Sequence, residues 1–401
     1  MNKLRIDSEK DLQSAESNGL LTEGHRLEFK SSLPSTKGTN KEVAKDLSSL
    51  SVDGGFYVIG VADEKDRPPA LCPFDTTGLA ERIDQITSTR VDPPLFVEVK
   101  ALPSDQAGGK GYVIVAVPPS SEAPHMVEGK YWGRDDKTKR ILTDREVQSL
   151  IERRQRYIES AEKELEAYVD RDPVQNGELA HYFAVAVPLG ATGRDLLRRS
   201  DLGADPWAAL RRMLKSRRGQ PLFSPSFANA GHTGTRPDGW ALASTGSLAG
   251  PRLVDVGEGG QDQEPSLLEV EFSHDGILRA YHSGVTRDAR QYGYMIADNL
   301  AAGMTVGLVA TAADVGTQIG YQGTWALGLA IRGPMIGMSA SSAVQNFMGL
   351  ASRYSANEFV RYTQASTVEL TQEPIEVAER LIGAFLMALG LDPTQKIRDN
   401  I

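Results

Sequence analysis

The stretch DGGFYVIGVAD at residues 53–63 decides the fold class of the first part of the chain. Its Gly54-Gly55 pair indicates a tight turn, and the apolar run after it predicts a short buried β-strand over residues 56–61. Upstream, residues 40–50 have helical periodicity, and residues 26–30 (RLEFK) alternate as a strand does. A strand, a helix and a second strand in succession predict a mixed α/β sheet.

The remaining elements of the first part continue this alternation. Thr143 and Glu146 have the spacing of a capping box, in which hydroxyl and carboxylate satisfy backbone donors at a helix start. The helix that follows extends to about residue 169, which is longer than a domain core requires, so we interpret residues 144–172 as a connector helix. The other predicted elements are a helix over residues 79–88, strands over residues 95–101, 111–117 and 131–134, and a hairpin at residues 106–110.

Residues 174–401 predict a second domain of mixed α+β type, so the expected fold class of the whole chain is α/β (α+β) in two parts. Asp205-Pro206 indicates a capped helix start, and residues 224–239 are rich in Gly, Pro and Ser, which is typical of a mobile loop. The predicted strands cover residues 181–187, 267–273, 277–282 and 325–331, and the predicted helices cover residues 206–217, 286–313 and 374–389.

Composition limits the class of protein. A chain of 401 residues favours two or three domains. A single cysteine, Cys72, excludes a disulfide framework and a multi-cysteine zinc site, and fits a reducing compartment. The first residues lack an apolar core of signal-peptide length, and the most apolar window, residues 296–312, contains Asp298 and is short for a membrane span. We therefore expect no membrane span and a cytoplasmic location.

Three acidic residues stand near predicted strand ends: Glu23, Glu28 and Asp63. Converging carboxylates repel one another unless a cation joins them, and carboxylate oxygens are ligands that Mg²⁺ or Mn²⁺ prefers. Such a metal can orient a phosphodiester and activate water. Lys30, two residues after Glu28 and on its face of the strand, could neutralise charge on the reacting phosphate. Acidic residues at strand ends are also commonly exposed caps, so both interpretations stay open.

The order of the motifs resembles the Schlafen-type AlbA-like domain over about residues 15–157, so we assign residues 1–157 to such a domain. The resemblance is carried by EGHRLEFK (23–30), a helix, DGGFYVIGVAD (53–63), APHMVEGKYWGR (123–134) and the capped helix at Thr143. In nuclease-active Schlafen proteins, a Glu-x4-Glu pair and a downstream Asp form a metal-dependent site that cuts tRNA and similar structured RNA. The resemblance therefore implies Glu23, Glu28 and Asp63 as metal ligands and tRNA-like RNA as the substrate.

This chain differs from vertebrate Schlafens in two ways that affect the expected metal content and oligomeric state. Vertebrate Schlafens have a zinc site of Cys and His, which a chain with only Cys72 cannot form. Their nuclease module holds two copies of the fold in a U-shaped cradle, whereas this chain has one, so we expect a homodimer or higher homo-oligomer. Residues 325–331 and 333–343 could supply the subunit contact or simply form the core of the second domain, to which we assign a regulatory or sensing role.

A net charge of −9 argues against non-specific coating of nucleic acid, so any RNA contact requires a local basic surface. The candidates are Arg134, Lys137, Lys139 and Arg140, although a solvated loop explains the same stretch. The leading hypothesis is a metal-dependent endoribonuclease, such as an anti-phage or stress-response effector. The alternative is a non-catalytic DNA- or RNA-binding transcriptional regulator. A third interpretation, an ATP-binding signalling protein, rests only on how relatives of the family are described, and the absence of the P-loop motif argues against P-loop ATP hydrolysis.

Overall fold

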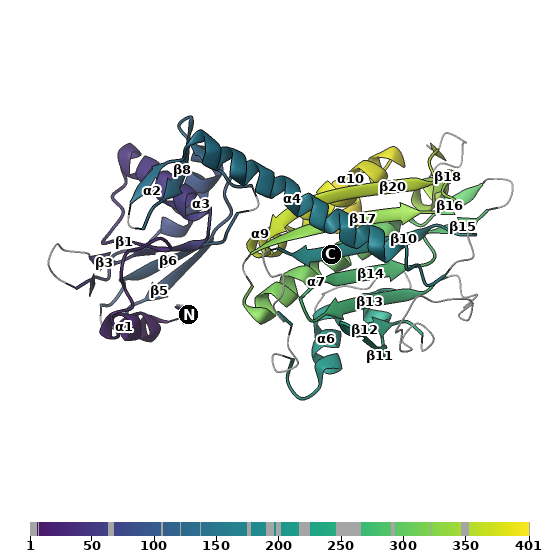
Figure 1. Ribbon diagram of the computed structural model, residues 1–401, viewed down its shortest axis with the longest axis horizontal. Helices are drawn as coiled ribbons and strands as arrows, with labels where there is room; N and C mark the ends of the chain where they lie inside the picture. Colours follow the sequence, from purple (N-terminus) through teal and green to yellow (C-terminus); the bar gives the residue numbers. More distant parts are fainter. Residues whose placement is uncertain are drawn as a thin grey trace. The chain divides into compact units, whose positions relative to one another are not determined.

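The computed structural model describes two compact units, residues Met1–Gln155 and Arg156–Ile401 (Figure 1). The described residues are 6, 8–62, 68–105, 107–120, 122–136, 138–174, 178–189, 196–197, 202–215, 225–245, 266–289, 293–321, 323–345 and 353–400. Both units combine helices with mixed or antiparallel sheets, which confirms the predicted α+β class.

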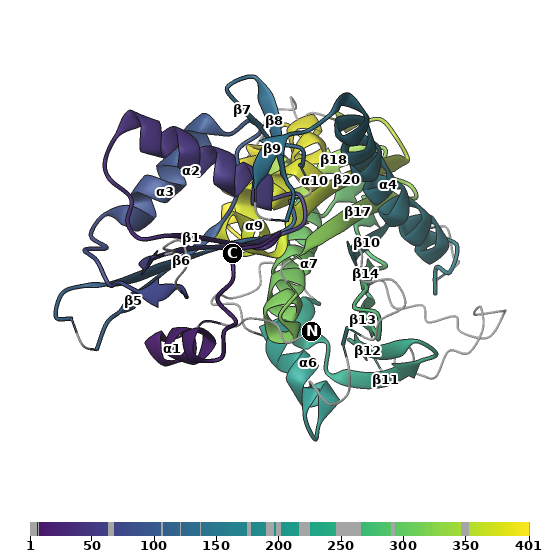
Figure 2. The same ribbon diagram turned by 60° about the vertical axis from the view of Figure 1, so that its left-hand side comes forward.

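The first unit is built on a four-stranded sheet of order β1-β2-β6-β5. Strand β1 is parallel to β2, and the other pairings are antiparallel. Helices α2 and α3 cover one face of this sheet and α1 covers the other (Figure 2). The elements are α1 (Glu9–Ser17), β1 (Leu27–Lys30), α2 (Lys37–Leu50), β2 (Gly55–Ile59), α3 (Leu79–Arg90), β5 (Glu98–Pro103) and β6 (Gly111–Val117).

Smaller strands complete the first unit. Strands β3 (Val61–Ala62) and β4 (Ala70–Leu71) form a pair, so the strand predicted over residues 56–61 is interrupted. The interruption is at Gly60, whose φ of 102° lies in a region that L side chains rarely adopt. A three-stranded sheet of β7 (Met126–Val127), β8 (Lys130–Arg134) and β9 (Lys139–Ile141) lies against α2.

Helix α4 (Asp144–Val169) begins with the predicted capping box. The Thr143 amide donates to Oε2 of Glu146 at 2.8 Å, and the Glu146 amide donates to Oγ1 of Thr143 at 3.4 Å. The residues of α4 from Arg156 onward belong to the second unit, where Ala161, Leu165 and Tyr168 pack on its sheet.

The second unit is built on a seven-stranded antiparallel sheet of order β11-β12-β13-β14-β10-β17-β20. The C-terminal half of α4 lies on one face, and α6, α7, α9 and α10 pack on the other (Figure 1). The strands are β10 (His181–Pro188), β11 (His232–Arg236), β12 (Gly239–Ala243), β13 (Leu268–Ser273), β14 (Leu278–His282), β17 (Thr324–Arg332) and β20 (Glu358–Ser366). The helices are α6 (Pro206–Lys215), α7 (Asp298–Ile319), α9 (Thr367–Gln372) and α10 (Pro374–Ala388).

A second, smaller sheet of order β15-β16-β18-β19 completes this unit. Its strands are β15 (Thr286–Asp288), β16 (Tyr294–Ile296), β18 (Gly337–Ser339) and β19 (Arg353–Tyr354). The remaining elements are the 3₁₀ helix η1 (Phe227–Asn229) and the short helices α8 (Ala340–Gln345) and α11 (Pro393–Arg398).

Two predictions for the second part are wrong. The helix predicted from residue 286 begins only at Asp298, because β15 and β16 occupy the residues before it. The loop predicted at residues 224–239 contains η1 and β11, whose pairing with β12 outweighs its Gly- and Pro-rich composition. Of the two interpretations left open for residues 325–331, the structure supports the second, because strand β17 lies buried between β10 and β20 in the core of its own unit.

Helix α7 is long and apolar enough to cross a membrane, judged by length and composition. Within the unit, however, 83% of its most apolar window is buried. Such burial is that of a core helix, and Tyr182 of β10 reaches it through a hydrogen bond of 3.1 Å between its hydroxyl and Oγ1 of Thr305.

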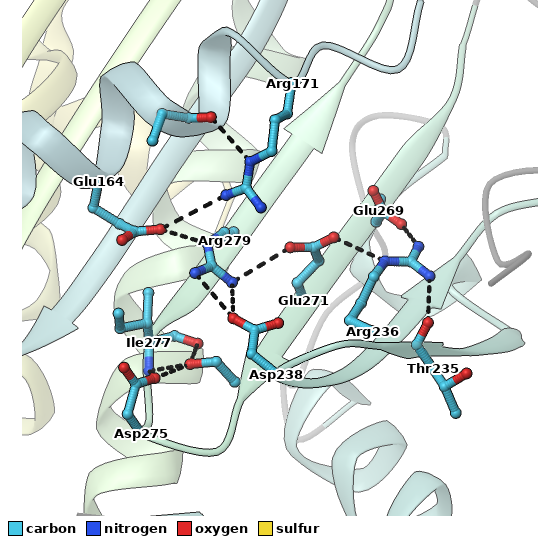
Figure 3. A network of polar contacts seen from close by, with 12 residues as sticks. Glu164, Arg171, Thr235, Arg236, Asp238, Glu269, Glu271, Asp275, Ile277 and Arg279 are labelled. Carbon is cyan, nitrogen blue, oxygen red and sulfur yellow. Dashed lines mark hydrogen bonds and ion pairs between the residues drawn. The ribbon is translucent and has the colours of Figure 1, made fainter. Parts of the chain in front are cut away.

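The α4 face of this sheet carries a network of ion pairs (Figure 3). Arg279 on β14 bonds to Glu164 of α4, with 2.6 Å between Nε and Oε1. Glu271 on β13 accepts from Arg236 at 2.9 Å and from Arg279 at 3.5 Å. Arg236 also pairs with Glu269. The network therefore joins α4 to three strands of the sheet, β11, β13 and β14.

Candidate active site in the first unit

Glu28 lies within β1, on the face of the sheet that α2 and α3 cover. Its neighbours Leu27 and Phe29 pack into the cluster on the α1 side. Because side chains alternate along a strand, Glu28 and Lys30 project to the opposite face. The register partner of Glu28 on β2 is the buried Tyr57, and the Glu28 side chain is 10% exposed. A carboxylate buried to this extent requires charge compensation.

Two cations compensate Glu28. Nζ of Lys30 donates to Oε1, and Nη2 of Arg134 donates to Oε2. Burial raises the pKa of Glu28, but the hydrogen bonds and charges of Lys30 and Arg134 outweigh it and hold the pKa below the ordinary value of 4.5. Glu28 is therefore an ionised carboxylate at neutral pH.

Arg134 stabilises the turn that precedes β1. Its Nε donates to the carbonyl oxygen of Gly24 at 3.0 Å, while Nη2 bonds to Glu28. Gly24 and Leu27 close the turn with reciprocal amide–carbonyl bonds of 3.0 and 3.3 Å. The Arg134 side chain is 1% exposed. This corrects the prediction that Arg134 is a surface contact for RNA phosphates, because its guanidinium is buried and used within the unit.

Glu23 stands at the open edge of β1. The carbonyl oxygen of Arg26 accepts a hydrogen bond from the amide of Phe56 in β2, and that of Lys30 accepts from the amide of Gly60, which follows β2. Phe29 is offset by one residue from this series, so its amide points away from the sheet. That amide donates to Oε1 of Glu23 at 3.1 Å. The structure thus places Glu28 on the face of β1 and the Glu23 side chain, from just before the turn, against the edge of the same strand.

The third predicted acid, Asp63, follows β3 and lies outside the described residues, as does Lys137 of the basic stretch. Among the residues that the structure describes, no group of three or more His, Cys, Asp or Glu side chains is placed to hold a metal ion. Glu23 and Glu28 do offer carboxylate oxygens, the donor chemistry of Mg²⁺ or Mn²⁺. Asp63 would have to complete such a donor set.

The described members of the basic stretch are all paired with carboxylates. Lys139 Nζ lies 2.7 Å from Oε2 of Glu42 and 2.7 Å from Oδ1 of Asp46. Arg140 Nε lies 2.7 Å from Oδ1 of Asp135, and its Nη2 lies 2.5 Å from Oε1 of Glu146. Their charges are largely neutralised locally, which weakens the case for a phosphate-binding surface at these two residues.

Sequence reasoning missed Asp46, which lies on α2 above the same face of the sheet. Asp46 is 2% exposed, and its Oδ2 is buried without a hydrogen-bond partner, as is the hydroxyl of Tyr57. Burial, followed by the charges of Asp46, Glu28 and Glu23, raises the pKa of Tyr57. The available signal was an acidic residue on the apolar face of the predicted helix, three residues after Val43.

Residues 23–143 match the family described as Schlafen, AlbA_2, which confirms the resemblance in this region, whereas the C-terminal region matches no family. No curated protein matches the chain.

Two solved structures are similar over 35% of the chain. The DIP2311 protein from Corynebacterium diphtheriae is 15% identical, with a TM-score of 0.24, and 28% of its own length is covered. The N-terminal domain of a protein from Nitrosomonas europaea, named as related to the ATP-dependent DNA helicase RecG, is 19% identical, with a TM-score of 0.24, and 94% of it is covered. The match thus spans less than a third of the DIP2311 protein, and scores this low support no inference about function.

Proposed function

We propose, from the match of residues 23–143 to the Schlafen AlbA_2 family, that the first unit is a metal-dependent endoribonuclease that cuts structured, tRNA-like RNA. Glu23, Glu28 and Asp63 would hold Mg²⁺ or Mn²⁺. The observation that carries the proposal is the buried, ionised Glu28, held by Arg134, which also bonds to the turn that directly follows Glu23. Buried ionised groups with specific charge partners concentrate at functional sites.

Some residues of the site would bind the metal or the phosphate, and others orient those residues. When bound, the metal would supply an activated water and stabilise the leaving oxygen of a phosphodiester. Arg134 keeps Glu28 in one orientation, and the Phe29 amide does the same for Glu23. Lys30, with 37% of its side chain exposed, carries the positive charge that can contact a non-bridging phosphate oxygen.

A second function, binding of DNA or RNA without cleavage, is favoured by a different observation. Both oxygens of Glu28 already accept hydrogen bonds from cations, so a purely structural ion-pair cluster also explains its burial. On this reading the first unit belongs to a transcriptional regulator. Loss of RNA cleavage on removal of one acid separates the two functions.

The test is a cleavage assay with structured RNA, including bulk tRNA, on the full chain and on Glu28→Gln. We expect cleavage with Mn²⁺ or Mg²⁺, none with EDTA, and at least a hundredfold loss of cleavage in Glu28→Gln with RNA affinity retained. Glu98→Gln, at an exposed carboxylate on β5, is the matched control. A Glu28→Gln variant that cuts as fast as the unaltered chain would refute the nuclease.

We further propose a homodimer or larger oligomer, because the family's RNA cradle needs two copies of the fold and this chain matches the family over residues 23–143 once. An intracellular RNase must be restrained, which supports an anti-phage or stress-response role with the second unit as its sensor. Light scattering tests the assembly, and a monomer that still cuts RNA would refute the two-chain cradle.

A further inference from the structure

The edge strands of the two main sheets are β1 and β5 in the first unit, and β11 and β20 in the second. Exposed sheet edges pair with other strands unless some device prevents it. On β1 the outward Phe29 amide is occupied by the Glu23 carboxylate. Strand β5 ends in Pro103, and β11 has only five residues, with the Thr235 carbonyl bonded to the buried Arg236. These three edges are therefore blocked or short.

Strand β20 differs from the other three edges (Figure 1). It has nine residues, and its sequence EFVRYTQAS contains no Pro, Gly or Lys. It pairs with β17 over its whole length without a bulge. Among the residues that the structure describes, no strand pairs with its outer edge. A long, regular edge of this kind can accept a further strand.

The hydrogen bonds at the two ends of β20 show which residues face outward. The Gly333 amide donates to the Asn357 carbonyl at 3.0 Å, and the Thr367 amide donates to the Gly323 carbonyl at 3.1 Å. Hydrogen-bonded pairs alternate along an antiparallel ladder. The odd-numbered residues of β20 therefore bond to β17, and the even-numbered residues from 358 to 366 direct their amides and carbonyls outward.

Both ends of this outer edge are closed by the chain itself. The Glu358 carbonyl accepts from the Tyr354 hydroxyl at 3.2 Å. The Ser366 amide donates to Oε2 of Glu369 at 3.2 Å, as part of the capping box that starts α9. Tyr362 lies midway between the two closed ends, so the pattern of closed groups is centred on Tyr362.

We propose that β20 pairs in antiparallel fashion with β20 of a second copy of this chain, with the Tyr362 residues of the two copies opposite each other on a two-fold axis. Val360 then lies opposite Gln364 of the second copy, and Glu358 lies opposite Ser366. The Glu358 carbonyl and the Ser366 amide would be acceptor and donor of one bond in this register. Because each chain satisfies both groups by itself, the missing bond leaves no group unpaired.

The charges of β20 favour the same register. With Tyr362 on the axis, the exposed Arg361 lies opposite Thr363 of the second copy. With Arg361 on the axis instead, two guanidinium groups would lie opposite each other, which is destabilising. The Val360 carbonyl accepts from the Arg361 guanidinium at 3.2 Å, and rotation of that exposed side chain releases the carbonyl for pairing.

A second copy is the occupant that this edge fits, because closed groups placed symmetrically about one residue suit a partner with the same edge and a two-fold axis. The inference rests on the proposed function only for the need of two chains. It places their contact in the second unit, on the strand next to β17.

The first experiment measures the dimer dissociation constant of the full chain by sedimentation velocity. In Val360→Pro an outward amide is lost and the bonds to β17 are kept, so the fold should persist, as circular dichroism would verify. The dissociation constant should rise at least about tenfold, because the two-fold axis removes two hydrogen bonds between the copies. Thr233→Pro, at an exposed position of the other edge strand β11, is the matched control and should dimerise like the unaltered chain.

The second experiment tests the register by cross-linking and does not depend on the proline variant. Cys72, the single cysteine of the chain, is first replaced in Cys72→Ser. Arg361 and Thr363 of opposite copies form a non-hydrogen-bonded pair, in which Cα atoms lie about 4.5 Å apart, within reach of a disulfide. The double variant Arg361→Cys/Thr363→Cys should therefore give a covalent dimer on oxidation, whereas each single variant should not.

The possible failures are distinguishable. A monomeric full chain would refute this inference together with the two-chain cradle, whereas the nuclease itself is tested by the cleavage assay on Glu28→Gln. A dimer that persists in a folded Val360→Pro variant, or that gives no cross-link in the double cysteine variant, would refute the β20 contact alone. A cross-link in Arg361→Cys alone would refute the register centred on Tyr362.

Discussion

Asp46 of α2 and Lys139 of β9 form a buried ion pair, with 2.7 Å between Nζ of Lys139 and Oδ1 of Asp46. The pair joins a helix on the main sheet to the separate three-stranded sheet that carries Arg134. Asp46 is almost fully buried, whereas 25% of the Lys139 side chain is exposed. Because Arg134 reaches Glu28 from that same small sheet, the Asp46–Lys139 pair helps hold the site together.

Lys139→Met should destabilise the first unit. The substitution leaves the Asp46 carboxylate buried without its counter-charge, and we expect a loss of about 2 kcal/mol, below the range for fully buried pairs because Lys139 is partly exposed. Urea denaturation measures the change. Lys41→Met is the control, since Lys41 pairs with the half-exposed Glu128 and should cost less than about 0.5 kcal/mol. Equal losses in the two variants would contradict the role assigned to the pair.

Asp46→Asn should change the dependence of stability on pH. Burial raises the pKa of Asp46 above 3.8, Glu28 raises it further, and Lys139 and Lys30 oppose them. The native state therefore holds this proton more tightly than the unfolded chain. The contribution of Asp46 to stability is highest below pH 3.8 and falls as pH rises through its raised native pKa.

The measurement is the free energy of unfolding in urea at several pH values from 4 to 7 for the unaltered chain and Asp46→Asn. The stability of Asp46→Asn relative to the unaltered chain should rise with pH across this window. A relative stability that is constant or declines with pH would show that Asp46 is ionised with an ordinary or lowered pKa.

Local sequence patterns predicted most of the helices and strands, because the formation of these elements depends largely on residues that are close in the sequence. Alternation and periodicity located β1, α2 and α10 to within a few residues, and the spacing of Thr143 and Glu146 located the start of α4. The same patterns failed where pairing between strands that are distant in the sequence determines the secondary structure. Residues 232–236, 286–288 and 294–296 form strands because they pair with other strands, and a local sequence window does not contain that information.

The candidate site was predictable in part for the same reason. Glu23 and Glu28 belong to one short string whose resemblance to a family is visible in the sequence. Arg134 lies 106 residues from Glu28, and a basic stretch alone cannot show that one of its members turns inward. Asp46 could have been noticed as a charge on an apolar helix face, but its partner Lys139 is 93 residues away.

Gly54→Ala should destabilise the turn before β2. Gly54 has a φ of 75°, and a Cβ at this position would lie 2.7 Å from Cδ of Pro119. Gly78→Ala is a matched control, because Gly78 has a φ of 67° but nothing within 4 Å of the added Cβ. Both variants carry the left-handed backbone cost of about 1–2 kcal/mol. Gly54→Ala should lose about 1–3 kcal/mol more from the clash, as measured by thermal and urea unfolding. Similar losses would mean that Pro119 moves aside freely.

The ion network of the second unit yields the last prediction. Arg279 is the residue that connects Glu164 of α4 to the sheet, and its side chain is 6% exposed (Figure 3). Arg279→Met removes the nearer cation from Glu164, which is 21% exposed and keeps only Arg171 at 4.0 Å. It also removes one of the two cations from Glu271, which is 10% exposed and keeps Arg236. Because removing one partner of a buried pair leaves the other charged and desolvated, we expect a loss of about 3 kcal/mol in the unfolding free energy of this unit.

A charge-matched comparison separates this network from ordinary surface ion pairing. Arg171 lies 4.0 Å from the same Glu164, but 47% of its side chain is exposed, so Arg171→Met should cost less than about 0.5 kcal/mol. In Arg279→Met, Arg236 alone is left to compensate both Glu269 and Glu271. The double variant Arg279→Met/Glu271→Gln should therefore recover about 1 kcal/mol or more relative to Arg279→Met, because neutralising Glu271 removes the surplus buried negative charge. Urea denaturation followed by tryptophan fluorescence reports on the unit through Trp240 and Trp325. If the double variant is less stable than Arg279→Met alone, Arg279 does not stabilise the unit by compensating the buried charge of Glu271.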